Sequence, residues 1–425
     1  MIVIKDISVV ENGKTIIYDY SVSTMFSKYF DKKNKFFASY EVDITSVPKS
    51  ILGIPLLANL LPISWFLDFK IQIEELDSSF VTCVNELKSE FQKMYPNHEL
   101  KGDLIVNNII TNSKAKSDKK AMLFSGGVDA ISAYIRHCTN DLSLFSIRGA
   151  DIELDDDERW NDLLDYNNTQ KYLSSNLKYT ISSNLRTFYT YKFENEVNLK
   201  WWGQVQHGLA LLGVTAPLTH LLKIDSLYIG STHTKKTQIS WGSTPITDEL
   251  LKWGDVDITH ECYDLSRQEK IKSILDFSKS TKKSIGLRVC YSERRETLNC
   301  SSCEKCLRTI MGIILEGSNP NHFGFIVDAS FYSKVDSLLK SKINTLGIYN
   351  HWKILQATAI KQKHFFVFDD GQVEKLKLEA FCNFHIKEPE LIKRVSSWEK
   401  WKFALINKYP VLFNFYMKFR LKLIK

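Results

Sequence analysis

The segment Ala121–Ala133, AMLFSGGVDAISA, constrains the fold of this chain more than any other. It begins with four apolar, strand-forming residues, and a segment able to start a helix follows the pair Gly126-Gly127. This order brings backbone N–H groups and a helix N-terminus to one point, which is a geometry that binds phosphate. An ordinary strand-to-helix turn is the alternative interpretation of the same residues.

The side chains of this segment suit a nucleoside triphosphate. Glycine lets the backbone approach a ligand without a Cβ atom in the way, while Ser125 adds a hydroxyl donor and Asp129 a carboxylate for magnesium. The segment has neither the GxxxxGK[ST] nor the GxGxxG pattern. We therefore expect Ser125, Gly126, Gly127, Val128 and Asp129 to bind ATP and Mg²⁺, with Ser125 and Asp129 also acting in catalysis.

From Ala121 onward, short apolar strands alternate with longer helical segments, as in a parallel sheet with helices on both faces. Asp141–Ile147 and Ile224–Ile229 are predicted strands, and Trp202–Leu222 is predicted to be one long buried helix. Ligands bind at the carboxyl ends of the strands in open α/β sheets. The three strand ends SGGVD, RGAD and GSTHT should therefore face one crevice.

We expect three parts along the chain, with the polar stretch Thr111–Lys120 as the first linker. They are an N-terminal α+β domain (1–115), an α/β domain with the phosphate loop (116–325) and a mainly helical, basic and aromatic extension (326–425). The apolar run Ile51–Leu67 is interrupted by two prolines. We interpret it as buried core, with a membrane-dipping segment as the alternative.

Polar residues after the second and third predicted strands are candidates for ligand contacts. Asp151 is expected to bind the adenosine ribose or magnesium, although its acidic surroundings are also typical of a solvated loop. Ser231, His233 and Trp241 follow the third strand, and we expect them to contact the substrate. The alternative for His233 is a structural polar residue.

Arg267 and Lys270 lie three residues apart on one face of a predicted helix. They are expected to act in catalysis by neutralising a leaving pyrophosphate. The alternative is a surface helix with ordinary ion pairs.

Four of the eight cysteines, Cys290, Cys300, Cys303 and Cys306, form a C-x9-C-x2-C-x2-C motif. Thiolates at this spacing can close a tetrahedral zinc site, and an all-cysteine site leaves zinc no open position, so its role would be structural. An iron–sulfur cluster is one alternative, and a catalytic thiol pair is another. The scattered remaining cysteines and the absence of a secretory signal favour the cytoplasm.

The net charge of +7 is concentrated near the end of the chain. Residues 398–425 hold six lysines and one arginine against one glutamate, so the rest of the chain is nearly neutral. A neutral body argues against a broad nucleic-acid-binding face. We expect the aromatic residues of this tail to dock on the body, with a membrane surface or an acidic partner as the alternative.

SGGVD resembles the SGGxDS signature of the PP-loop ATP pyrophosphatases. Together with Cys290-Tyr291 and CSSCEKCLR (Cys300–Arg308), it is similar to 7-cyano-7-deazaguanine synthase and its relatives. The resemblance spans about 121–324 and implies a PP-loop fold, ATP on the loop, zinc on the four cysteines and Arg308 beside them. It also implies that a deazaguanine carboxylate is adenylated, with pyrophosphate release, and then attacked by ammonia. Ala130 replaces the last serine of the signature, which puts one phosphate contact in doubt.

The resemblance does not cover the first 110 or the last 100 residues, so a different substrate or a protein partner stays open. Divergent relatives that resemble this layout occur in anti-phage systems, where a deazaguanine is joined to a protein, and others resemble amidotransferases of surface-polysaccharide synthesis. A nucleotide-binding scaffold without turnover and a tRNA-modifying enzyme are further alternatives. The preferred hypothesis is an ATP-dependent ligase acting on a small carboxylate.

Overall fold

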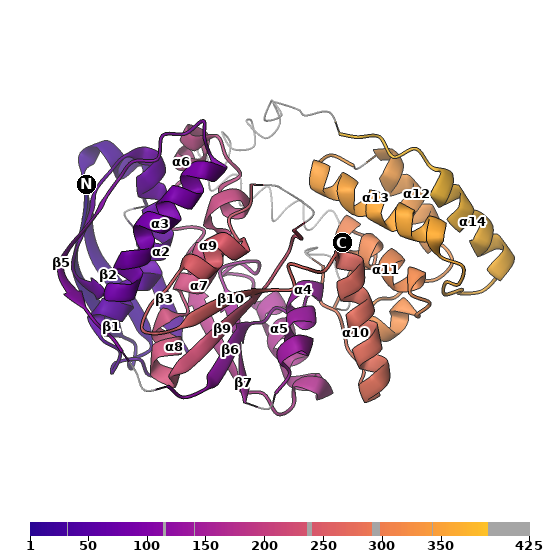
Figure 1. Ribbon diagram of the computed structural model, residues 1–425, viewed down its shortest axis with the longest axis horizontal. Coiled ribbons are helices and arrows are strands. Elements are labelled where there is room, and N and C mark those ends of the chain that lie inside the picture. Colours follow the sequence, from indigo (N-terminus) through magenta and orange to yellow (C-terminus); the bar gives the residue numbers. More distant parts are fainter. Residues whose placement is uncertain are drawn as a thin grey trace.

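The computed structural model describes residues 1–31, 33–113, 116–139, 141–235, 240–290, 298–341 and 343–389. Within these residues one ten-stranded sheet runs through the molecule in the order β10-β9-β6-β7-β8-β3-β2-β1-β4-β5 (Figure 1). The basic aromatic stretch 398–425 lies outside the described residues. The strands are β1 (Ile2–Val10), β2 (Thr15–Val22), β3 (Phe37–Tyr40), β4 (Ile71–Asp77), β5 (Leu104–Ile110), β6 (Lys119–Leu123), β7 (Leu142–Arg148), β8 (Lys178–Ser183), β9 (Ile224–Gly230) and β10 (Asp257–Glu261).

The chain therefore folds as an α/β protein with a mostly parallel sheet. The strands β10, β9, β6, β7 and β8 pair in parallel, and antiparallel pairing is confined to β8 with β3, β3 with β2 and β2 with β1. Side chains alternate between the two faces, as the period of a strand requires. In β6, Ala121 and Leu123 enter one core, whereas Met122 enters the other.

Helices cover both faces of the parallel part of the sheet. The core on one face is shared with α1 (Lys49–Leu52), α2 (Ile54–Leu67), α3 (Ser78–Met94), α6 (Tyr191–Val197), α7 (His207–Gly213) and α8 (Ala216–Leu222). The core on the other face is shared with α4 (Val128–His137), α5 (Asp157–Thr169), α10 (Arg267–Thr281) and α11 (Glu304–Leu315). A further short helix, α9 (Pro245–Leu250), contacts α3 and α7.

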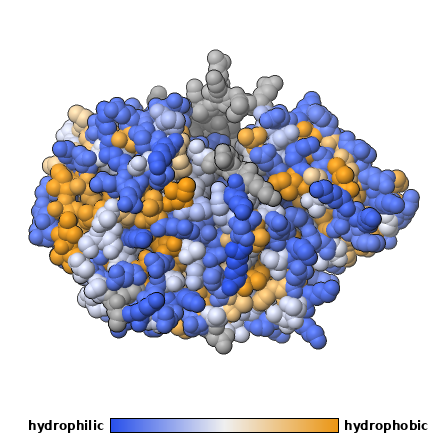
Figure 2. All heavy atoms as spheres, viewed as in Figure 1, coloured by the Kyte–Doolittle hydropathy of each residue, from blue (hydrophilic) through white to orange (hydrophobic). Residues whose placement is uncertain are grey.

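The N-terminal strands extend the same sheet through the pairing of β3 with β8. The apolar run Ile51–Leu67 forms α1 and α2 and is almost fully buried, as expected for core. At the far edge, β5 exposes Ile105, Ile109 and Ile110, and Figure 2 shows apolar side chains gathered at that end of the molecule. No described helix is both long and apolar enough to cross a membrane.

At the opposite end lie the helices α12 (Phe331–Ser341), α13 (Leu346–Lys361) and α14 (Gly371–Asn383) (Figure 1). Helices α12 and α13 pack against α11, and α14 packs against α12 and α13. The extension is thus helical over its described residues.

The prediction of one long helix over Trp202–Leu222 is wrong. A π-helical turn (Trp202–Gln206) leads into α7, and Val214 and Thr215 separate α7 from α8. Within this turn, Gly203 allows a close approach of the ring of Trp241, which would lie 2.7 Å from a Cβ atom there. A π-helical turn of this kind is often found at functional sites.

Candidate active site

One pocket lies where three parallel strands end. It is lined by Ser125, Gly127, Val128 and Asp129 after β6, by Ala150 and Asp151 after β7, and by Gly230 and Thr232 at the end of β9. The hollow measures about 1090 Å³, including the part open to solvent.

The backbone amides of residues 125–129 have no partner among the described residues, and Ser125, Gly127, Val128 and Asp129 of this segment line the pocket. Phe124 N–H donates to Phe145 O at 2.8 Å, and Ile131 N–H donates to Gly127 O at 2.9 Å. These two hydrogen bonds involve the amides on either side of the segment. Between them, no described residue accepts a hydrogen bond from the five amides. Because Gly127 caps α4, the positive end of that helix also points at the pocket. The segment therefore has the donors that an anion such as phosphate requires.

The two glycines of the loop have different constraints. Gly126 has a φ of +72°, and a Cβ atom there would lie 2.6 Å from Cε1 of Tyr166. A Cβ atom on Gly127 would meet its nearest atoms, Ser125 Oγ and Arg288 O, only at 3.5 and 3.6 Å. Gly126 is thus required by the fold, whereas Gly127 leaves space that a ligand can use.

Alanine substitutions should separate these two roles. We expect Gly126→Ala to lower the free energy of unfolding by about 1–3 kcal/mol, since φ and packing both oppose it. Gly127→Ala should leave folding nearly unchanged and weaken ATP binding by roughly tenfold or more, because the new methyl group enters the phosphate position. Urea denaturation and titration calorimetry with MgATP measure the two effects. Equal ATP affinity in Gly127→Ala and the wild type would contradict the assignment.

Asp129 lies at the centre of a charged network in the pocket. Its Oδ1 is 3.2 Å from Nζ of Lys270, and its Oδ2 is 3.5 Å from Nη1 of Arg267. Lys270 is buried, and its Nζ also donates to the carbonyl of Ser231. Burial raises the pKa of Asp129, but the charges on Lys270, Arg267 and Lys305 outweigh it and bring the pKa down to about 2. The carboxylate is therefore ionised at neutral pH and can act as a metal ligand.

This depressed pKa predicts how stability depends on pH. The pKa falls from its ordinary value of 3.8 to about 2 on folding, so ionised Asp129 contributes about 2 kcal/mol above pH 4. That contribution is lost as the pH falls from about 4 to about 2. We expect the difference in unfolding free energy between the wild type and Asp129→Asn to shrink by about this amount over that range. Urea denaturation at several pH values measures it, and a constant difference would contradict the network.

Two further cations join Arg267 around the pocket. Arg267, Arg288 and Lys305 all line the pocket, and Arg288 N–H donates to Gly126 O at 2.8 Å. Burial lowers the pKa of Lys305 to about 8, although the charge of Asp151 opposes this shift. The oxygens of a bound polyphosphate would replace the contacts with water that these cations lose on burial. The pocket wall is thus suited to a multiply charged anion.

The remaining predicted residues occupy different positions around this centre. Asp151 lines the pocket. Ser231, His233 and Trp241 are not among the residues that line it in the described structure. Ser231 is fully buried and its hydroxyl donates to the carbonyl of His233 at 2.6 Å, while the ring of His233 lies 5.0 Å from that of Trp241. Of the three, Ser231 is joined to the charged network of Asp129, because its carbonyl accepts from Lys270.

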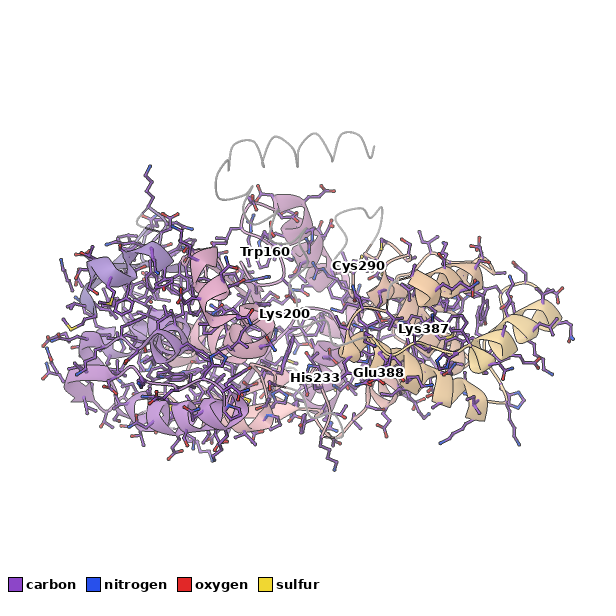
Figure 3. All side chains as sticks on the ribbon, turned by 90° about the horizontal axis from the view of Figure 1, so that it is seen from above. Trp160, Lys200, His233, Cys290, Lys387 and Glu388 are labelled. Atoms are coloured by element: carbon purple, nitrogen blue, oxygen red, sulfur yellow. The ribbon has the colours of Figure 1, made fainter. Side chains whose placement is uncertain are left out.

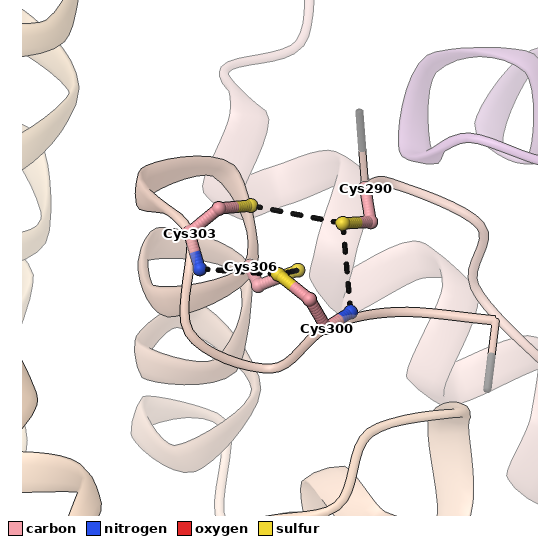
Figure 4. Close-up of side chains that lie close together, drawn as sticks. All are labelled: Cys290, Cys300, Cys303 and Cys306. Atoms are coloured by element: carbon pink, nitrogen blue, oxygen red, sulfur yellow. Dashed lines mark hydrogen bonds between the residues drawn. The ribbon is translucent and has the colours of Figure 1, made fainter. Parts of the chain in front are cut away.

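The four cysteines of the sequence motif come together beside the pocket (Figure 4). Their Sγ atoms all lie within 4.8 Å of one another, and the pairs Cys290–Cys303 and Cys300–Cys306 are each 3.9 Å apart. Tetrahedral zinc with bonds of about 2.3 Å requires sulfur–sulfur distances of about 3.8 Å. The geometry therefore fits a metal ion such as zinc.

Backbone amides and one buried side chain support this cysteine cluster. Cys303 N–H points at Sγ of Cys300 at 3.3 Å, an outer-shell contact that stabilises a thiolate ligand. Oδ1 of Asn299 accepts from the N–H groups of Val289 and Cys290, and its Nδ2 donates to Leu287 and Gly324. Asn299 thus joins the segment that supplies Cys290 to the loop that supplies the next cysteine.

The cysteine cluster also positions part of the pocket wall. Arg288 lies two residues before Cys290, and Lys305 lies between Cys303 and Cys306 at the start of α11. A metal ion that fixes these segments would therefore fix two of the pocket cations. Sequence reasoning missed Arg288, Lys305 and Asn299 as well as His207, which lines the pocket from the first turn of α7.

Comparison with protein-family models and with curated proteins identified no relative of this chain. No protein-family model matches the chain, and a search of curated proteins found no match.

Proposed function

We propose that this chain is a cytoplasmic ATP-dependent ligase of the PP-loop class that adenylates a carboxylate and transfers the acyl group to ammonia or an amine. The observation that carries the proposal is the set of unpaired amides at residues 125–129, which face a pocket with cationic walls. Free N–H groups are found at the start of every α-helix, so the proposal depends on their position beside the pocket cations Arg267, Arg288 and Lys305, which favours an anionic ligand.

In this proposal each residue of the pocket has a defined part. The amides of 125–129 and the hydroxyl of Ser125 bind phosphate oxygens of ATP, and Asp129 holds Mg²⁺. Magnesium would supply charge neutralisation for the phosphates when bound. Arg267 and Lys270 neutralise pyrophosphate as it leaves, and Asp151 binds the ribose of ATP or magnesium. The chain thus acts by positioning and electrostatic stabilisation.

The reaction proposed at this site proceeds in two steps. A carboxylate oxygen attacks the α-phosphorus of ATP, and the bond to pyrophosphate breaks, which leaves an acyl-adenylate. The nitrogen of ammonia or an amine then attacks the acyl carbon and displaces AMP. The resemblance to 7-cyano-7-deazaguanine synthase makes a deazaguanine carboxylate the first substrate to test, and a zinc ion on the four cysteines would be structural.

The test is incubation of the full chain with MgATP and 7-carboxy-7-deazaguanine, with and without ammonia. The proposal predicts AMP and pyrophosphate in equal amounts, together with a mass change in the small molecule or in an added protein acceptor. Formation of ADP in place of AMP would contradict it.

A nucleotide-binding scaffold without turnover is the second candidate. Ala130, which is buried, stands where the PP-loop signature has its last serine, so one hydroxyl is missing from the phosphate site. Tight binding of ATP with no AMP for any carboxylate would favour this candidate.

A further inference from the structure

Two histidines and a tryptophan lie together, and one of them, His207, lines the pocket. His207, at the start of α7, lines the pocket, and His233 follows β9. The ring of Trp241 lies between them, with centroids 5.7 Å from His207 and 5.0 Å from His233. We call these three residues the imidazole cluster.

The backbone around the imidazole cluster is firmly held. Gly242 N–H donates to Gly203 O at 2.9 Å, and Gly208 N–H donates to Gly242 O at 2.8 Å. Nearby, the buried carboxylate of Asp248 accepts from Ser243 Oγ at 2.6 Å and contacts His260 Nδ1 at 2.7 Å. A Cβ atom on Gly208 would lie only 2.2 Å from Asp248. The positions of the rings are therefore set before any ligand binds.

Each of these rings has a buried nitrogen without a partner among the described residues. They are Nδ1 of His207, Nε2 of His233 and Nε1 of Trp241. Leaving such an atom unpaired is unfavourable, so unpaired buried nitrogens are often ligand contacts. Burial lowers the pKa of both imidazoles, that of His233 to about 4. Both rings are therefore neutral at pH 7 and able to accept a proton or a hydrogen bond.

A chain of contacts links His233 to the phosphate loop. Asp129 pairs with Lys270, Lys270 donates to the carbonyl of Ser231, and the hydroxyl of Ser231 donates to the carbonyl of His233. Seen from above, His233 and Cys290 both lie near the middle of the molecule, between its N-terminal part and the C-terminal helices (Figure 3). The imidazole cluster is thus joined to the pocket by His207, which lines it, and to Asp129 by the contacts of Ser231 and Lys270.

We infer that the imidazole cluster is the amine site of the proposed ligase, and that His233 is the base for the second step. This inference rests on the proposed function. The ligand is ammonia or an unbranched primary amine in its uncharged form, whose hydrogens are bound by Nδ1 of His207 and Nε2 of His233.

The step balances without any further reactant. The amine lone pair forms a C–N bond to the acyl carbon, and the C–O bond to AMP breaks with its electron pair leaving on the phosphate. The proton released by the amine passes to Nε2 of His233.

The experiment compares two nucleophiles in His233→Gln, with MgATP and 7-carboxy-7-deazaguanine as substrates. Hydroxylamine is strongly nucleophilic and uncharged at neutral pH, so it needs no base, whereas ammonia does. We expect pyrophosphate exchange and hydroxamate formation to stay within about threefold of the wild type, and amide formation from ammonia to slow roughly 100-fold. His322→Gln, at an exposed histidine, is the matched control and should change neither reaction.

A second variant guards against a purely structural effect. In His233→Ala, free imidazole should restore amide formation without changing the hydroxylamine reaction. Equal slowing of both nucleophiles in His233→Gln, an unchanged ammonia rate, or failure of imidazole to rescue His233→Ala would overturn the assignment of the base. Absence of exchange in the wild type would instead overturn the proposed function, and this inference with it.

Discussion

Asp129→Ala is expected to reduce the exchange of labelled pyrophosphate into ATP by about 1000-fold. The carboxylate is the acidic group placed nearest to the free amides of the loop, and it is held by Lys270 at 3.2 Å and Arg267 at 3.5 Å. Its loss removes the proposed metal ligand and changes the position of both cations. Exchange needs only the first half-reaction, so it reports on this site alone.

Stability must be measured alongside activity for this variant. Removing one partner of a buried ion pair costs about 3–5 kcal/mol, because the other charge stays buried without compensation. Asp264→Ala is the matched control, since Asp264 is an exposed carboxylate paired with Arg136, and it should keep wild-type exchange. A folded Asp129→Ala chain with wild-type exchange would show that the assignment is wrong.

Cys306→Ser is expected to have the second largest effect, on metal content and folding together. Cys306 is fully buried on the first turn of α11. Because binding of structural zinc is coupled to folding, the variant should lose its metal and several kcal/mol of unfolding free energy. ATP binding should weaken as well, since Lys305 and Arg288 lie on the segments that the metal holds. Elemental analysis, urea denaturation and calorimetry measure the three effects.

Cys138→Ser provides the control, because Cys138 is exposed and stands apart from the cluster. It should keep its metal and its stability. Purified wild type with neither zinc nor iron at near one ion per chain would contradict the metal site. If the protein instead held one iron–sulfur cluster per chain, the four cysteines would still be the ligands, but the metal would be iron and not zinc.

The features that local sequence could predict are those formed by residues close together in the chain. The phosphate loop depends on one strand, two glycines and one helix start, all within Ala121–Ala133. Three of the four cysteines lie within Cys300–Cys306, so their approach is also local. The meeting of three strand ends at one pocket follows from parallel pairing, in which all carboxyl ends lie on the same edge.

Other features depend on contacts between distant segments and had no local pattern. The pairing of Ala38–Tyr40 with Ile181–Ser183 joins the N-terminal strands to the sheet. The sequence of neither strand indicates which strand it pairs with. The helix expected over Trp202–Leu222 is interrupted at Val214 and Thr215. His207 lies in this apolar stretch and gave no signal of its own. Arg288 and Lys305 could have been found, since each lies within two residues of a cysteine of the C-x9-C-x2-C-x2-C motif.

The most direct test of this account is a structure of the chain with MgATP in its non-hydrolysable α,β-methylene form. The account predicts triphosphate oxygens within hydrogen-bonding distance of the amides between Phe124 and Ile131, with the metal on Asp129. An ordered triphosphate bound elsewhere, with these amides left free, would contradict it.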